Sequence, residues 1–351
     1  MNAGYLEVFQ SAIDSVFETG HVLNGKHLQN FEEAFARYQG VENCIGVANG
    51  LDAMTLILRA LKIGPGDEVI VPAFTFIATW FAISLVGATP VPVDVNKNAL
   101  LDPDLVRSAI GQKTKAILTV DLFGQMSHIQ ELKTIAEEFG IFLIEDAAQA
   151  HGAERDGIKA GQLSIAAAFS FYPTKNLGAL GDAGAVLTQD SDLAKKVREI
   201  ANYGSSQKYI HHTLGVNSRM DEIQAFILEN KLHNLSEDNL KRSQIAKKYE
   251  QACKNSGIKY ISQQNGSVYH LFVVVLESRS KFQNFLKSNG VSTLIHYPES
   301  PLESHVYFDK YEPDMFPNAQ KFSKSVLSLP LWPNMKNTQV EYVCSLLETY
   351  M

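Results

Sequence analysis

The sequence has few cysteines, no long apolar run and no excess of positive charge, and each scarcity excludes a class of protein. Its three cysteines, Cys44, Cys253 and Cys344, lie far apart and form no pair with the spacing of metal ligands. This pattern is typical of a reducing compartment, and it argues against a disulfide framework and a structural zinc or iron–sulfur site. We therefore expect neither a disulfide nor a bound metal.

Membrane and export signals are also missing from the sequence. No stretch reaches the roughly 18 apolar residues of a transmembrane helix, and residues 1–5 lack the basic and apolar regions of a secretory signal. Lysine and arginine number 31 against 38 aspartates and glutamates, which gives a net charge of −7. We predict a cytoplasmic protein without a membrane partner or a general nucleic-acid surface.

Short apolar segments alternate with helical patterns along most of the chain. Such strands between helices indicate a mainly parallel sheet that is covered by helices on both faces. Strands are predicted at 68–71, 89–93, 116–120, 141–144 and 166–170, and helices at 5–19, 28–38, 53–61, 74–86, 104–110 and 129–139. The fold class is therefore α/β, in which ligands bind beyond the carboxyl ends of the strands.

The pattern changes towards the C-terminus. Residues 220–252 are largely helical, and their polar part, from Glu237 to Glu250, predicts a long solvated helix that leaves the sheet. After it we predict a strand at 268–276, a helix at 280–289, a strand at 291–296, a proline-rich loop at 298–317 and a closing helix. We predict a large domain over residues 1–240 and a smaller α+β domain over 241–351.

One segment carries an ionisable residue in an unusual place. An apolar strand ends at Ser170, a turn containing Pro173 follows, and Lys175 precedes a glycine-rich loop. A lysine in a partly desolvated pocket can lose its proton and become an amine nucleophile that forms a Schiff base. By itself, the segment fits an ordinary surface lysine better, because lysines prefer water.

Two further signals lie upstream of this lysine. Asp146 follows the strand at 141–144, and a buried carboxylate there needs a partner such as the protonated nitrogen of pyridoxal phosphate. Asn49 and Gly50 precede a helix, whose free amides and dipole favour an anion such as phosphate. Each signal alone has an ordinary interpretation, as a capping aspartate or a simple turn. Together with Lys175, they supply the parts that this cofactor needs.

These segments carry a resemblance to a known family. The chain resembles the DegT/DnrJ/EryC1/StrS sugar aminotransferases, which have the aspartate aminotransferase fold (fold type I), over nearly its whole length. The matching motifs are GPGDEVIVP at 64–72, TFIAT at 75–79, EDAAQAHG at 145–152, FSFYPTKNLG at 169–178, NSRMDE at 217–222 and LSLPL at 327–331. The resemblance implies a pyridoxal phosphate-dependent transferase with a large sheet domain and a smaller C-terminal domain.

The resemblance also implies roles for the residues at matching positions. Lys175 would form the Schiff base and then act as general acid and base, while Asp146 would pair with the pyridine nitrogen. Further cofactor contacts would come from Gly50, Leu51, Asp52, Phe76, Gln149 and Ser170, and from Asn217 of the neighbouring subunit. Substrate contacts would come from Tyr172, His296 and Tyr297. The family members are homodimers with shared active sites, and their cofactor alternates between pyridoxal 5'-phosphate and pyridoxamine phosphate.

Within the family, residues 203–209 and 215–219 and the pair Thr79-Trp80 are similar to enzymes that aminate C3 of dTDP-3-keto-6-deoxyhexoses. Glutamate would be the amino donor, and the product would serve a surface polysaccharide or a glycoside. Lys208 and Tyr209 would then meet the diphosphate, and Arg219 the diphosphate or the glutamate carboxylate. Lys208 alone also fits a solvated loop lysine.

Two departures from the family pattern affect the expected contacts. Leu51 stands where relatives usually carry threonine, so backbone donors must hold the phosphate. The segment 298–305 differs in length and charge from the usual pattern, and Glu299 and Glu303 would repel a diphosphate if they faced it.

Three alternatives remain at this stage. One is amination at C4 of a 4-keto-6-deoxy sugar nucleotide. A second is the sugar dehydratase branch, in which histidine replaces the lysine; Lys175 and the scattered cysteines argue against it. A third is a non-catalytic sensor or scaffold of the same fold, against which the Asp146 and Lys175 pair weighs. The configuration of the sugar and the nucleotide base are not specified by the sequence.

Overall fold

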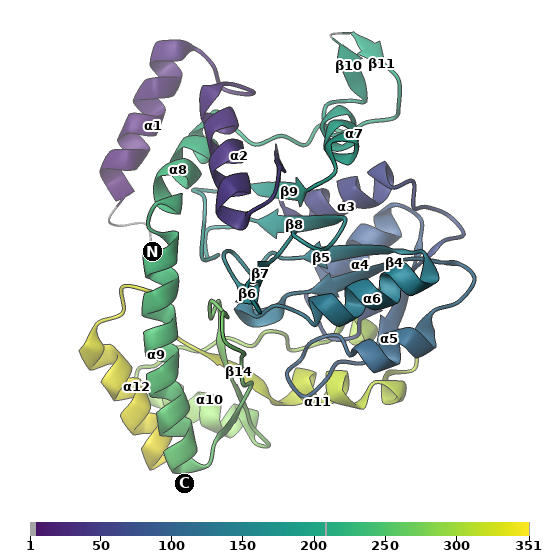
Figure 1. The fold of residues 1–351 in the computed structure, drawn as a ribbon. Helices are drawn as coiled ribbons and strands as arrows, with labels where there is room; N and C mark the ends of the chain where they lie inside the picture. Colours follow the sequence, from purple (N-terminus) through teal and green to yellow (C-terminus); the bar gives the residue numbers. More distant parts are fainter. Residues whose placement is uncertain (1–4, 208, 351) are drawn as a thin grey trace.

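The computed structural model describes residues 5–207 and 209–350, and its centre is a seven-stranded sheet (Figure 1). The strand order is β1-β9-β8-β5-β4-β2-β3, and only β9 runs antiparallel to its neighbours, so the predicted mainly parallel sheet is confirmed. The strands are β1 (Asn43–Val47), β2 (Glu68–Pro72), β3 (Thr89–Val93), β4 (Thr114–Val120), β5 (Phe142–Asp146), β8 (Ala166–Ser170) and β9 (Gly184–Thr188).

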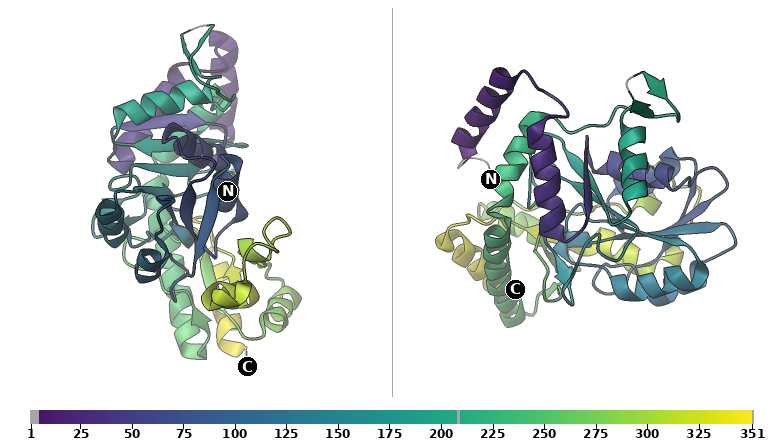
Figure 2. Two further views of the ribbon diagram at one scale, coloured as in Figure 1. Left: turned by 90° about the vertical axis from the view of Figure 1, so that its right-hand side faces the viewer. Right: turned by 45° about the horizontal axis from the view of Figure 1, so that its top comes forward.

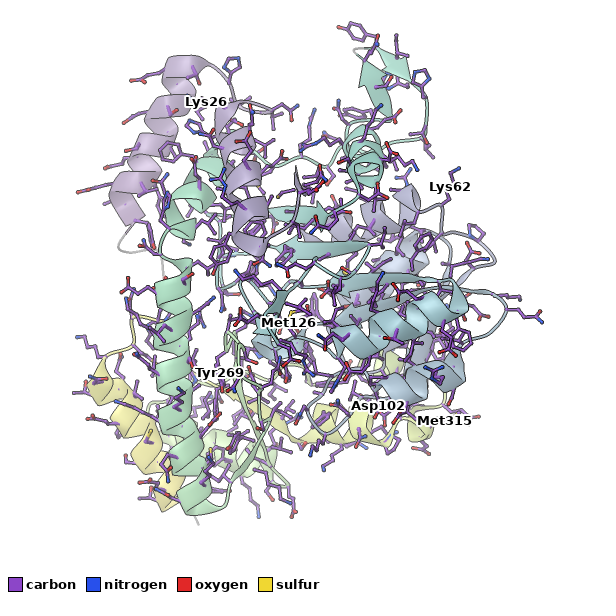
Figure 3. All side chains as sticks on the ribbon, viewed as in Figure 1. Lys26, Lys62, Asp102, Met126, Tyr269 and Met315 are labelled. Carbon is purple, nitrogen blue, oxygen red and sulfur yellow. The ribbon has the colours of Figure 1, made fainter. Side chains whose placement is uncertain are left out.

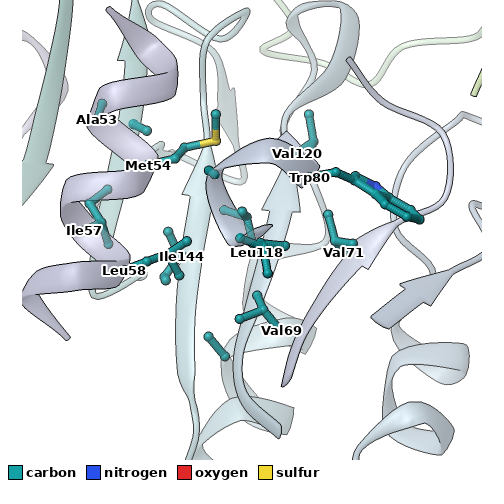
Figure 4. Close-up of a cluster of buried hydrophobic side chains, with 14 of the residues drawn as sticks. Ala53, Met54, Ile57, Leu58, Val69, Val71, Trp80, Leu118, Val120 and Ile144 are labelled. Carbon is teal, nitrogen blue, oxygen red and sulfur yellow. The ribbon is translucent and has the colours of Figure 1, made fainter. Parts of the chain in front are cut away.

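Helices cover both faces because side chains alternate along each strand. Val69 and Val71 contribute to one buried core, and Ile70, between them, contributes to the other. The first face carries α3 (Gly50–Ala60), α4 (Ile77–Leu85) and α7 (Ser191–Ala201), and the second carries α2 (Lys26–Gln39), α5 (Pro103–Ala109), α6 (Ile129–Phe139) and α8 (Glu222–Leu232). Figure 4 shows part of the first core, where Met54 and Ile57 of α3 lie over the sheet.

Helix boundaries follow local capping. α5 begins at Pro103, one residue before the predicted helix at 104–110, and Asp102 caps it by accepting the N–H of Asp104 at 3.0 Å. The predicted helix at 74–86 begins later, at Ile77, because Phe76 has extended backbone angles and caps α4. Phe76 therefore stands at the end of a loop, where its ring is half-exposed.

The C-terminal part holds a separate three-stranded antiparallel sheet, of which β14 is labelled in Figure 1. Its strands are β12 (Lys259–Tyr260), β13 (Phe272–Val275) and β14 (Val326–Leu329), and its helices are α9 (Leu235–Ser256), α10 (Arg279–Ser288), α11 (Pro317–Ser325) and α12 (Asn337–Thr349). The prediction that α9 is solvated was wrong for one face. Ile245, Tyr249 and Cys253, at helical spacing, are buried in a core that α12 also lines.

Two strand predictions in this region need correction. The segment 268–276 is a strand only from Phe272, because Val268 and Leu271 donate instead to the carbonyls of Gly124 and Phe123. The segment 291–296 is not a strand, and Leu294 alone pairs with Ser328. The predicted domain boundary at 240/241 lies inside α9 and stays a prediction.

The remaining elements lie at the periphery. They are α1 (Leu6–Thr19), β6 (Glu154–Arg155), β7 (Ile158–Lys159), β10 (Ser205–Gln207) and β11 (Ile210–His211). The β10–β11 hairpin projects away from the sheet in both Figure 1 and the right-hand view of Figure 2. Over the residues that the structure describes, no helix is both long and apolar enough to cross a bilayer.

Candidate active site

A cavity of about 440 Å³, hereafter the main cavity, opens beyond the carboxyl ends of β4, β5 and β8. The strands end there at Val120, Asp146 and Ser170, which all line it. The structure brings together at this place the predicted residues Gly50, Leu51, Phe76, Asp146, Gln149, Ser170, Tyr172, Lys175, His296 and Tyr297. The position agrees with the expectation that ligands of such a sheet bind beyond its strand ends.

Asp146 is the last residue of β5, and its carboxylate is fixed on two sides. Oγ1 of Thr79 donates to Oδ2 at 2.8 Å, and the N–H of Ala148 donates to Oδ1 at 3.2 Å. Burial raises the pKa of Asp146, while these two bonds and the charge of Lys175 oppose the rise. Among the ion pairs of the described residues none involves Asp146, so a cationic donor in the main cavity would complete its surroundings.

Glu145, one residue earlier, faces the other side of the sheet because strand side chains alternate. Its Oε1 accepts from the N–H of Gly161 at 2.8 Å and from the hydroxyl of Ser164 at 2.5 Å. Its Oε2 and Oδ2 of Asp121 are buried without a hydrogen-bond partner among the described residues, and burial raises the pKa of Asp121 to about 7 and of Glu145 to about 8. A proton held between these two carboxyls would satisfy both oxygens, and the pair belongs to the framework behind the main cavity.

Lys175 follows the turn that leaves β8. Its backbone N–H donates to the carbonyl of Tyr172 at 2.8 Å, which closes the turn. The side chain is partly buried in the wall of the main cavity. Burial lowers the pKa of Lys175 to about 8, and the charge of Asp146 limits the fall. Near neutral pH this amine loses its proton more readily than that of an exposed lysine.

The N-terminus of α3 forms another part of the wall. Oδ1 of Asn49 accepts the N–H of Asp52 at 2.8 Å, so this amide is engaged in capping and Asp52 lies outside the lining. A Cβ on Gly50 would lie 2.9 Å from Cβ of Ser170, so glycine allows the helix to begin directly against the strand end. The backbone at Gly50 and Leu51, together with the hydroxyl of Ser170, forms a wall with the chemistry of a phosphate site.

Gln149 and Tyr297 join the sheet domain to the C-terminal part. Oε1 of Gln149 accepts the N–H of Phe123 at 2.7 Å, and its Nε2 donates to the hydroxyl of Tyr297 at 2.9 Å. The ring centroids of Phe76 and Tyr297 lie 5.3 Å apart, at 35°. His296 bonds through Nδ1 to the hydroxyl of Ser328 at 2.9 Å. An aromatic edge formed by Phe76 and Tyr297 therefore flanks the main cavity.

Several predicted residues lie elsewhere. Asn217 and Arg219 line a second cavity of about 390 Å³, which shares Asp182 with the main cavity. Tyr209 is exposed in the turn of the β10–β11 hairpin, and Lys208 lies outside the described residues. Within the chain, Asn217, Arg219 and Tyr209 are therefore not gathered around Lys175.

The two sequence departures have local explanations. The carboxylate of Glu303 accepts from the N–H and the hydroxyl of Ser300, at 2.8 and 3.1 Å, so it caps its own short turn. Glu299 is exposed and lies outside the lining of the main cavity. The backbone of Leu51 lies at the helix start, where a side-chain hydroxyl is dispensable if the amides hold the anion.

Trp80, part of the pair that is similar to the C3 aminotransferases, does not line the main cavity. Its side chain is fully buried in the core, and Nε1 donates to the carbonyl of Pro72 at 3.0 Å. Tyr307 and Tyr311 pack against the ring with centroid distances of 5.0 and 5.3 Å. Thr79 and Trp80 are consecutive residues of α4, so their side chains point in different directions. That of Thr79 points towards Asp146, and that of Trp80 points into the core.

Three lining or supporting residues were not predicted for their observed roles. Thr79 ends the TFIAT motif at 75–79, but the motif alone does not show that its hydroxyl bonds to Asp146. His270 sits in a segment predicted as strand, and only the turn before Phe272 brings it to the cavity wall. Asp182 lies in the glycine-rich loop after Lys175, which offered no signal for this residue.

Comparisons with known proteins agree with this geometry. The model of the DegT/DnrJ/EryC1/StrS aminotransferase family matches residues 6–348. A relative from Aneurinibacillus thermoaerophilus, dTDP-3-amino-3,6-dideoxy-alpha-D-galactopyranose transaminase, is 44% identical over 353 residues, which cover 100% of this chain and 97% of the relative.

Two solved structures are similar to the chain over almost its full length. S. venezuelae DesV, solved in complex with a ketimine intermediate, has a TM-score of 0.96 and 42% identity, covering 99% of this chain and 96% of its own. NtdA from Bacillus subtilis, solved with bound cofactor PMP, has a TM-score of 0.92 and 32% identity, covering 99% of this chain and 82% of its own.

Proposed function

The chain belongs to the DegT/DnrJ/EryC1/StrS aminotransferase family, and we propose that it is a pyridoxal phosphate-dependent aminotransferase of nucleotide-linked keto sugars. The specific reaction is the transfer of an amino group from glutamate to C3 of a dTDP-linked 3-keto-6-deoxyhexose. The similarity to an enzyme named for a dTDP-3-amino sugar supports the position and the nucleotide.

One observation carries the proposal: Asp146 and Lys175 line the same cavity, beside the N-terminus of α3. The three parts differ in chemistry, and each matches a different part of the cofactor. A buried carboxylate without an ion-pair partner among the described residues suits the pyridinium N–H, a lysine of lowered pKa suits the aldehyde, and a helix start suits the phosphate.

The remaining contacts follow from the wall of the main cavity. Gly50, Leu51 and Ser170 would hold the phosphate, and Phe76 would cover a face of the ring. Gln149 would lie near the ring hydroxyl, and its hydrogen bond to Tyr297 would hold it there. When bound, pyridoxal phosphate supplies an electron sink for the carbon that bears the amino group.

The residues of the chain then have distinct tasks. Asp146, held by Thr79 and Ala148, would keep a proton on the ring nitrogen because its ionised form favours the charged partner. Nζ of Lys175 would take a proton from the amine-bearing carbon and return one, because a pKa of about 8 lets the same group act as base and as acid near neutral pH. Phe76 and Tyr297 restrict access of water from their side.

We assign the sugar nucleotide to the side of the cavity that Tyr172, His296 and Tyr297 line. Asn217 and Arg219 would act on the neighbouring subunit of a homodimer, and Lys208 and Tyr209 would meet the diphosphate. Half-exposed or exposed apolar side chains around this region, Tyr203, Leu214 and Val216, support such an interface.

The test offers the purified protein glutamate and dTDP- or UDP-linked 3-keto and 4-keto-6-deoxyhexoses, and then locates the new amine by NMR. We expect an amine at C3 of the dTDP sugar. Amination at C4 alone would contradict the position but leave the reaction class intact. Lys175→Ala should lose turnover and the Schiff-base absorption band, whereas Lys195→Ala, at an exposed position of α7, should keep both. Full turnover by Lys175→Ala would overturn the proposal.

A further inference from the structure

The segment 170–176 carries Lys175, and we call it the lysine turn. Its last residue, Asn176, is held by its side chain. Nδ2 of Asn176 donates to Oδ1 of Asn239 at 2.9 Å and to the carbonyl of Val268 at 3.0 Å. A carbonyl can only accept, so the amide nitrogen of Asn176 faces both partners. Oδ1 of Asn239 is therefore the acceptor that ends the lysine turn.

Asn239 also reaches the beginning of the lysine turn, through His151. Nδ2 of Asn239 donates to the carbonyl of His151 at 2.9 Å, and Nε2 of His151 donates to the carbonyl of Ser170 at 2.8 Å. Both acceptors are carbonyl oxygens, so the directions of both hydrogen bonds are fixed. Ser170 is the last residue of β8. A single asparagine of α9 thus connects the two ends of the lysine turn.

The contact between Asn239 and the chain at His151 depends on a close approach. The next residue, Gly152, has a φ of +81°, and a Cβ there would lie 3.2 Å from Nδ2 of Asn239 and 2.5 Å from the hydroxyl oxygen of Tyr38. Asn239 is only 9% exposed. Water therefore cannot readily replace a hydrogen bond that this side chain loses.

The position of Asn239 is set by further contacts of α9. Arg242 lies on the same face of the helix, and its Nη1 donates to the carbonyl of Tyr269 at 3.4 Å and to that of Leu331 at 3.3 Å. Tyr269 lies beside α9 in Figure 3, and its hydroxyl donates to Glu250 at 3.0 Å. These bonds hold α9 against the C-terminal part and do not involve the lysine turn. α9 is therefore an independent support for this turn.

We propose that Asn239 positions Lys175: by joining the two ends of the lysine turn, its amide holds the amino group of Lys175 at the wall of the main cavity. Asn239 is a positioning residue, since it lies outside the lining of this cavity and acts through the turn. The inference rests on the proposed function, because it takes Lys175 as the reacting amine. Without Asn239 the turn would keep its backbone bond to Tyr172 but lose its attachment to α9.

The ionisation of Lys175 reports whether its amine stays in place. Burial lowers the pKa of Lys175 to about 8, and the charge of Asp146 on β5 limits the fall. Burial also lowers the pKa values of His151, His270 and His296, so these nearby rings are neutral. A loosened turn would admit water to the amine. The pKa of Lys175 would then rise towards its ordinary value.

The measurement is the pH dependence of reductive methylation of Lys175 in the full-length, cofactor-free chain, followed by mass spectrometry. Asn239→Leu keeps the size of the side chain and removes both hydrogen bonds. We expect it to raise the titration midpoint of Lys175 by roughly one pH unit, about tenfold in its acid constant. Asn239→Ala removes the same bonds without adding bulk and should shift the midpoint in the same direction.

A double variant tests the route from Asn239 to Lys175. Asn176→Leu and Asn239→Leu remove the same hydrogen bond from opposite sides. The double variant should therefore shift the midpoint by less than the sum of the two single variants. Additive shifts would show that the two asparagines act separately and would contradict the inference.

Two controls separate positioning from ordinary destabilisation. Asn255→Leu, at an exposed position of α9, should leave the midpoint of Lys175 unchanged. Phe282→Leu, in the buried core of the C-terminal part, should lower thermal stability and also leave the midpoint unchanged.

An unchanged or lowered midpoint in the Asn239 variants would overturn the inference. Equal shifts in Asn239→Leu and Phe282→Leu, with equal losses of thermal stability, would also overturn it, because they would indicate a general loosening of the fold. The labelling needs neither cofactor nor substrate, so its failure leaves the proposed reaction untouched. Failure of the native protein to aminate any keto sugar would instead refute the proposed function.

Discussion

The hydroxyl of Thr79 lies 2.8 Å from Oδ2 of Asp146, so a neutral donor from α4 fixes the carboxylate that ends β5. This bond lowers the pKa of Asp146 and favours the ionised form that a pyridinium nitrogen needs. Thr79→Val removes the donor and keeps the shape. We expect roughly tenfold weaker binding of pyridoxal phosphate, as for the loss of one hydrogen bond to a charged group. An absorbance titration measures the dissociation constant.

Thr75→Val provides the matched control for this prediction. Oγ1 of Thr75 lies 3.1 Å from Oγ1 of Thr79 and is one bond further from the carboxylate. Thr75→Val should therefore change cofactor affinity much less than Thr79→Val does. Equal affinities of Thr79→Val and the native protein would show that the hydroxyl does not support the cofactor through Asp146.

Gly50→Ala tests the phosphate wall. The added Cβ would lie 2.9 Å from Cβ of Ser170, so the start of α3 must move away from β8. We expect at least roughly tenfold weaker cofactor binding, because the amides that face the anion move with the helix. Gly111→Ala is the control, since its Cβ would meet only Oε2 of Glu68 at 3.8 Å. A Gly50→Ala protein with native affinity would contradict this placement of the phosphate.

Glu145→Gln tests the shared proton between Asp121 and Glu145. Their pKa values rise on folding from 3.8 to about 7 and from 4.5 to about 8, so the folded protein retains protons that the unfolded chain releases. Their contribution to stability is full below the unfolded values and is lost as the pH rises through the folded ones. The amide oxygen of glutamine can still accept from the N–H of Gly161 and the hydroxyl of Ser164. Its amide N–H can donate to the carboxylate of Asp121 at any pH.

Thermal unfolding at about pH 6 and about pH 8 measures this effect, with the window taken from the raised pKa values. We expect the native protein to lose stability between the two, and Glu145→Gln to lose clearly less. Glu137→Gln, at an exposed position of α6, should follow the native protein. A steeper loss in Glu145→Gln than in the native protein would argue against a shared proton.

Trp80→Phe separates core packing from substrate recognition. Figure 4 shows Trp80 near Val71 and Val120, and its indole N–H bonds to Pro72. Phenylalanine leaves that carbonyl without its donor and leaves a small void. We expect a destabilisation of about 1–3 kcal/mol by denaturant unfolding, with an unchanged KM for the sugar nucleotide. A large change in KM with native stability would return Trp80 to the substrate side.

Local patterns in the sequence predicted the parallel sheet and the placement of Gly50, Asp146 and Lys175, whereas the other residues of the main cavity followed from the family resemblance. Strand ends at Asp146 and Ser170 are visible as apolar runs followed by polar residues. Parallel strands then bring such ends to the same edge. This reasoning requires no side-chain geometry.

The errors arose where tertiary contacts decide the outcome. The polar composition of α9 concealed a buried face that became visible only with α12 against it. Thr79 and Trp80 are neighbours in sequence, yet Thr79 faces the carboxylate of Asp146 and Trp80 faces the core. The start of α4 at Ile77 decides these two directions. The position of His270 in the cavity wall depends on the irregular backbone before Phe272, whereas the apolar pattern of this segment predicts a strand.

The opposite orientation of Glu145 and Asp146 has a consequence for how the chain tolerates insertions and deletions. A one-residue shift in the register of β5 would turn both acids to the opposite faces of the sheet, so the carboxylate of Asp146 would no longer point towards the main cavity from the end of the strand. A length change in the turn between α6 and β5 should therefore be harmful to activity out of proportion to its effect on folding, which makes this turn a poor place for tags or insertions.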